Sequence, residues 1–153
     1  MKNFAKYFAL ALLLSFLLVT AKSQAQGKHP GYLHALTDLR TARWLLSHQG
    51  GDKQVYADED VAIKEIEAAI GEIKKAAIDD GKDINEHEHI DVTEHGSRLL
   101  KAMETLKKAR ADVDQEEDNP EAHGLKQRAG EHIQRALEAT DRAHSRWLKD
   151  MGK

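Results

Sequence analysis

Apolar residues recur every three or four positions in four stretches of the sequence, and charged residues fill most positions between them. This spacing is typical of amphipathic α-helices, and no stretch shows the strict alternation typical of strands. The predicted apolar faces are Tyr32, Leu36, Leu39 and Leu46; Ile63, Ile66, Ile70 and Ile73; Leu99, Met103, Leu106 and Val113; and Leu125, Ala129, Ile133 and Ala136. The pattern predicts an all-α protein.

Capping residues, prolines and glycines set the expected ends of these helices. The expected boundaries are Pro30 and Gly50-Gly51 for the first helix, Asp58 or Asp60 and Gly81 for the second, a capping box at Asp91-Val92-Thr93-Glu94 for the third, and Asn119-Pro120 at the start of the fourth. Four amphipathic helices joined by turns pack most simply as an antiparallel up-down-up-down four-helix bundle. We therefore predict this arrangement.

The first 25 residues have the pattern of a secretory signal peptide. Lys2 and Lys6 precede an apolar run at 7–19, and Ser23-Gln24-Ala25 offers small residues to a signal peptidase. The run is shorter than the roughly 20 residues that span a bilayer, so we expect cleavage and no membrane insertion afterwards. The expected organisation is a signal peptide at 1–25 and the bundle at 26–153, in the periplasm or secreted.

Composition excludes several classes of function. The chain has no cysteine, which excludes a disulfide framework, a thiolate metal site and covalent haem attachment. Loss of Lys2, Lys6 and Lys22 with the signal peptide changes the net charge from −3 to −6, which argues against nucleic acid as a partner. Motifs for zinc proteases, serine hydrolases and phosphate-binding loops are missing from the sequence. We do not expect an enzyme.

Histidine is the residue type that carries a chemical signal, with nine in the chain. In an up-down-up-down bundle, the start of the first helix, the second turn, the start of the third helix and the end of the fourth share one end. That end would collect His29, His34, His87, His89, His95 and His144, whereas His48 and His123 would lie at the other end. Imidazole and carboxylate groups together are ligands that borderline divalent ions prefer.

The densest stretch, residues 86–95, holds three imidazoles and four carboxylates. Asp91 and His95 are one turn apart if the third helix begins at its capping box, so both can reach a single ion. The expected metal ligands are Glu86, His87, Glu88, His89, Asp91, His95 and His144. Cu(II) is the favoured ion by the usual order of affinities, and Zn(II) or Ni(II) are alternatives. The competing interpretation is a solvated polar loop without metal.

Other polar and aromatic positions have structural interpretations. His132 lies within the apolar stripe of the fourth helix, where a hydrogen-bonded histidine is commoner than a metal ligand. His34 and Asp38 are spaced to form a surface salt bridge on the outward face of the first helix. Trp44 and Trp147 lie near helix ends, and we expect them to plug the core at opposite ends of the bundle.

The fourth predicted helix contains Ala129-x-x-His132-x-x-x-Ala136 within a cysteine-free, histidine-bearing chain of four helices. In this respect the chain resembles the bacterial small metal-binding protein family, which are periplasmic bundles that take up divalent metals, copper above all. The resemblance covers about 58–147. It departs from the family in the second predicted helix, which contains no histidine. The resemblance implies metal binding or buffering rather than catalysis.

Two functions therefore stand as expectations. The first is a periplasmic protein that sequesters or buffers divalent metal ions at a histidine- and carboxylate-rich end. The alternative is a structural or partner-binding bundle of the cell envelope without metal, in which the histidines make the surface responsive to pH.

Overall fold

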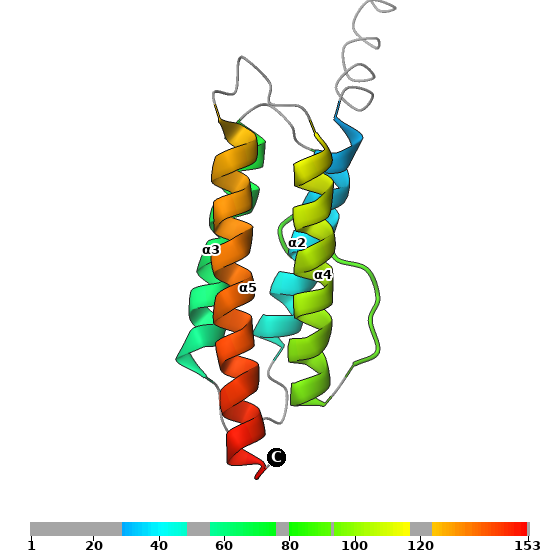
Figure 1. The fold of residues 1–153 in the computed structure, drawn as a ribbon. Helices are drawn as coiled ribbons and strands as arrows, with labels where there is room; N and C mark the ends of the chain where they lie inside the picture. Colours follow the sequence, from blue (N-terminus) through cyan, green and yellow to red (C-terminus); the bar gives the residue numbers. More distant parts are fainter. Residues whose placement is uncertain (1–28, 49–55, 76–79, 93, 117–123, 153) are drawn as a thin grey trace, which may run out of the picture. The chain divides into compact units, whose positions relative to one another are not determined.

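The fold is described from a computed structural model (Figure 1), and the structure describes residues 29–48, 56–75, 80–92, 94–116 and 124–152. The predicted signal peptide at 1–25, the predicted Gly50-Gly51 stop, the Asn119-Pro120 cap and His123 lie outside the described residues. Residues Gly31–Lys153 form one compact unit, and the contacts below are contacts within it.

Four helices make up this unit: α2 (Pro30–Ser47), α3 (Ala57–Lys75), α4 (His95–Gln115) and α5 (Leu125–Asp150). The described ranges contain no strand, and the predicted all-α class is confirmed. Among the described residues, no helix combines the length and the apolar character that crossing a membrane requires.

The predicted apolar faces form the core. Most of their residues are buried, and only Ile63 and Met103 are half-exposed. Burial of about 25 cal/mol per Å² of apolar surface provides the main driving force for this packing. Arg40 of α2 is also buried, with its guanidinium group paired to Asp80.

The third predicted helix begins later than its capping box indicated. Glu94 is the N-cap of α4 and its carboxylate accepts a hydrogen bond from the Ser97 backbone nitrogen at 3.1 Å. Asp91 therefore precedes the helix, and the expected one-turn spacing of Asp91 and His95 is wrong. α5 begins after Gly124, whose φ of 74° is a left-handed conformation that glycine adopts without steric conflict.

α5 runs antiparallel to both α3 and α4. Its start meets the end of α4, because Lys126 Nζ donates to the Asp114 carbonyl at 2.6 Å. Its end meets the start of α4, where Trp147 packs so closely on Gly96 that a Cβ atom there would overlap the indole ring. Two ion pairs between α5 and α3 have the same antiparallel order: Arg128 near the start of α5 pairs with Glu72 near the end of α3, and Arg142 nearer the end of α5 pairs with Asp58 at the start of α3. Consequently α3 and α4 run parallel to each other.

α2 runs antiparallel to α4. The Gly31 backbone nitrogen donates to Glu116 Oε1 at 2.5 Å, and Arg98 Nη1 donates to the Leu45 carbonyl at 3.2 Å. α2 and α5 therefore run in one direction, and α3 and α4 run in the opposite direction, as Figure 1 shows. The predicted up-down-up-down order is wrong for this unit.

The physical reason for this difference is the length and composition of the link between α3 and α4. An extended chain advances about 3.3 Å per residue, so residues 76–94 can cover the length of a helix and return the chain to its starting end. Residues 80–92, here called the crossover segment, contain Ile84, Ile90 and Val92, which are partly buried against the core. These apolar residues anchor a segment that the sequence pattern suggested was a polar turn.

Candidate histidine-rich site

The crossover separates the histidines that the sequence pattern had grouped. His34 lies in the first turns of α2, at the end of the unit where Gly31 meets Glu116, and His29 directly precedes that helix. His95 begins α4 at the opposite end. The prediction that His34 shares an end with His95 and His144 is therefore wrong, because α2 is antiparallel to α4.

A different set of histidines gathers where α2 and α5 end and α4 begins. We call this set the histidine end: His48, His87, His95 and His144, together with Trp44, Tyr56 and Trp147. Each of these imidazoles contacts an aromatic ring. The two tryptophans lie at the same end of the unit, not at opposite ends as predicted.

Two imidazoles stack on the indole ring of Trp44. The His48 ring centroid lies 4.3 Å from that of Trp44, and the His87 centroid lies 4.4 Å from it. His48 follows one turn after Trp44 at the end of α2, whereas His87 comes from the crossover segment. Arg43 Nη1 donates to Asn85 Oδ1 at 3.2 Å and holds the crossover segment against α2 beside them.

The hydrogen bond of His87 determines which ring nitrogen carries its proton. Nδ1 lies 2.7 Å from the Glu88 carbonyl oxygen, which can only accept a hydrogen bond. Nδ1 must therefore be the donor, and in the neutral ring Nε2 keeps its lone pair. A backbone carbonyl that holds one ring nitrogen in this way is the usual support of a metal-binding histidine.

His95 has a different role, because its imidazole is buried and bonded to a carboxylate. Its Nε2 lies 3.0 Å from Glu59 Oε1, and the same oxygen accepts the Tyr56 backbone N–H at 3.1 Å. Glu59 is 1% exposed, and its second oxygen has no hydrogen-bond partner within the described part of the chain. The contact therefore links the starts of α3 and α4, and metal binding at this nitrogen would break a buried bond.

The remaining predicted ligands are not gathered at one point. Glu86, Glu88, His89 and Asp91 are exposed in the crossover segment, and His144 stacks on Trp147 with centroids 5.8 Å apart. Across the described ranges, no three histidine, aspartate or glutamate side chains converge as metal ligands. Of the predicted set, His87 is the one that shares an aromatic partner, Trp44, with an exposed imidazole, that of His48. His48, which stacks on the same indole ring, was not among the predicted ligands. Trp44 and His48 are four residues apart in the sequence, a spacing that brings two side chains together on one face of a helix.

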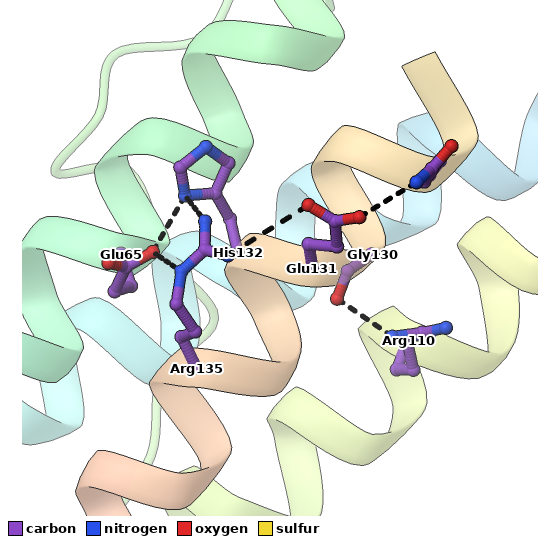
Figure 2. Close-up of polar contacts among 7 residues, drawn as sticks. Glu65, Arg110, Gly130, Glu131, His132 and Arg135 are labelled. Carbon is purple, nitrogen blue, oxygen red and sulfur yellow. Dashed lines mark hydrogen bonds and ion pairs between the residues drawn. The ribbon is translucent and has the colours of Figure 1, made fainter. Parts of the chain in front are cut away.

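His132 is part of an ionic cluster between α3 and α5 (Figure 2). Its Nδ1 lies 2.6 Å from Glu65 Oε2, and Arg135 Nε donates to the same oxygen at 2.9 Å. Burial alone would raise the pKa of Glu65, but the hydrogen bonds from His132 and Arg135 outweigh it and hold the pKa below its usual value. The prediction of a hydrogen-bonded histidine is confirmed.

A second polar site is a pocket of about 440 Å³ between α2, the crossover segment and α4. Its lining residues are His34, Thr37, Asp38, Lys82, Glu88 and Asp112. Burial and then the neighbouring Asp112 carboxylate raise the pKa of Asp38 to about 6. Asp38 was predicted to lie on the outward face of a helix, and the crossover segment covers part of that face.

Comparisons with known proteins give no match: no family model, curated protein or solved structure matches this chain significantly.

Proposed function

We propose that this protein binds divalent transition-metal ions, with Cu(II) favoured over Zn(II) and Ni(II), through the imidazoles of His48 and His87. The observation that carries the proposal is the stacking of these two imidazoles, from separate segments, on Trp44. Neutral imidazole nitrogen is a preferred donor for all three ions, and Cu(II) binds such sites most tightly. The role is sequestration or buffering in the periplasm or outside the cell, after removal of the predicted signal peptide.

The state of the imidazoles supports this proposal. His48 is exposed and His87 is half-exposed, so an ion in solvent reaches both. The Glu88 carbonyl holds the proton of His87 on Nδ1, which leaves Nε2 as the donor atom. In the described part of the chain, neither that nitrogen nor the His48 ring has a hydrogen bond that a metal would have to displace.

Carboxylates and a third imidazole on the crossover segment supply further donors. Glu86, Glu88, His89 and Asp91 are exposed on either side of His87, and Glu86 pairs with Lys82 at 3.8 Å. His95 is left out of the proposed ligand set, since its Nε2 is engaged with buried Glu59. His144 lies at the histidine end on α5 and remains a candidate for a weaker site of its own.

The test is a Cu(II) titration followed by tryptophan fluorescence. The chain has two tryptophans, so Trp147→Phe leaves Trp44 as the single reporter. We expect saturable quenching, because bound Cu(II) would lie beside the indole ring. His48→Ala and His87→Ala should each raise the Kd at least about tenfold, the equivalent of roughly 1.4 kcal/mol. His132→Ala is the matched control, since that histidine lies in the α3–α5 cluster.

Two results would exclude the proposal: quenching without saturation, or equal effects of His132→Ala and His87→Ala. Affinity should also fall steeply below about pH 6, because imidazoles must be neutral to bind metal. Calorimetric titration of the same variants with Zn(II) and Ni(II) ranks the three ions by affinity.

The alternative, a structural or partner-binding protein of the cell envelope without metal, is favoured by one observation. His95 and His132 each form a carboxylate contact between helices and so contribute to packing. A ligand that binds the folded state alone must raise the melting temperature. An equal melting temperature with chelator and with excess Cu(II) would favour this alternative.

A further inference from the structure

A groove between α4 and α5 carries opposite charges on its two walls. It encloses about 450 Å³ and is lined by Met103, Lys107, Arg110, Gln134, Leu137, Glu138 and Asp141. Met103 and Leu137 are half-exposed apolar side chains, and Leu100 beside Met103 on α4 is 52% exposed. The groove involves no residue of the histidine end.

The charges of the two walls are arranged by helix. Lys107 and Arg110 belong to α4 and form a basic wall, whereas Glu138 and Asp141 belong to α5 and form an acidic wall. Arg110 is engaged within the chain, with its Nη1 donating to the Gly130 carbonyl at 2.8 Å (Figure 2). Lys107 and Asp141 are exposed, and the described residues provide no ion pair for either side chain.

The register of the helices places these two free charges at opposite corners of the groove. α4 and α5 meet at Arg110 and Gly130 toward one end and at Gly96 and Trp147 toward the other. Lys107 is near the first contact and Asp141 is nearer the second. If two copies meet face to face across a two-fold axis that lies in the contact plane, the corner with Lys107 on one copy can lie against the corner with Asp141 on the other. Each of the two charges then faces a charge of opposite sign.

We propose that this groove is a self-association surface, and that its occupant is a second copy of this chain. In a two-fold contact every pairing occurs twice, so Lys107 meets the partner's Asp141 and Asp141 meets the partner's Lys107. Met103 and Leu137 form the apolar centre of the contact, and Leu100 extends it along α4. A partner with charge of one sign, such as a nucleic acid or an anionic membrane, would be repelled by one of the walls.

The test is sedimentation velocity over a range of protein concentrations, in buffer with chelator so that bound metal plays no part. We expect a monomer–dimer equilibrium that weakens as salt is raised, because exposed charge pairs are screened. Lys107→Glu and Asp141→Lys should each weaken the dimer at least about tenfold, since each reversal creates two repulsive contacts. The double variant should restore most of the affinity, because the exchanged charges again face their opposites.

Lys64→Glu is the matched control, because Lys64 is exposed on α3 and its reversal changes the net charge by the same amount. Circular dichroism confirms that each variant is folded. The proposal would be overturned if Lys64→Glu changed the dissociation constant of the dimer as much as Lys107→Glu does. It would also be overturned if the protein were a monomer at every concentration. Failure of the double variant to recover affinity would exclude the predicted pairing. None of these results depends on the metal proposal.

Discussion

The ionised Asp38 carboxylate should destabilise the folded protein at neutral pH. The pocket between α2, the crossover segment and α4 raises its pKa from 3.8 to about 6, through burial first and then through Asp112. A raised carboxyl pKa means that the folded state binds more protons than the unfolded state between about pH 4 and pH 6. Stability therefore falls as the pH rises through this window, and the full penalty is present above it.

The size of this penalty follows from the shift. About two pH units at 1.36 kcal/mol each give roughly 3 kcal/mol as an upper bound. Asp38 is about half-exposed, so solvent screening reduces the expected effect to ~1 kcal/mol. Asp38→Asn keeps the shape of the side chain and removes its charge. It should stabilise the protein by this amount at pH 7.5, which corresponds to roughly 3 to 5 °C in Tm.

The assay is urea and thermal unfolding of both proteins at pH 4 and pH 7.5, in buffer with chelator. At pH 4 the Asp38 carboxyl is mostly protonated in the folded state, so Asp38→Asn should have little effect there. Asp91→Asn is the control, because it removes an exposed carboxylate from the crossover segment and should have little effect at either pH. Destabilisation by Asp38→Asn at pH 7.5, or equal stabilisation at pH 4 and pH 7.5, would refute the reasoning.

Three further substitutions test the packing of the unit by urea unfolding. Hydrogen bonds from Lys75 and Arg128 lower the pKa of Glu72 to about 2, so Glu72→Gln should destabilise the folded protein by ~1 kcal/mol at pH 7. That difference should disappear as the pH falls from about 4.5 to 2; an unchanged difference would contradict it. Gly96→Ala should cost about 1 to 3 kcal/mol, because the added Cβ meets the Trp147 ring. His95→Ala should cost about 3 kcal/mol, since it removes the side-chain partner of the buried Glu59 carboxylate and leaves only the Tyr56 backbone N–H, and adding Glu59→Gln should recover part of the loss. Additive losses in that double variant would show that the two side chains are not coupled.

The candidate site was partly predictable. The stretch at 86–95 was identified from its imidazoles and carboxylates, and His87 within it is the proposed ligand. His48 was assigned to the wrong end, because its position relative to His87 depends on the path of the crossover segment. His95 was predicted to be a ligand, and its Nε2 contacts Glu59, a residue 36 positions away that no local pattern connects to it.

The helices and their buried faces follow from the sequence, because a period of 3.6 residues is a local property and the apolar side must be covered. The all-α class, the start of α2 at Pro30 and most of the core could be predicted in this way. The directions of the helices were decided by tertiary packing. Ile84, Ile90 and Val92 bury apolar surface along the crossover segment, and α4 consequently runs parallel to α3. Which histidines meet depends on those directions, since side chains far apart in the chain become neighbours through packing alone.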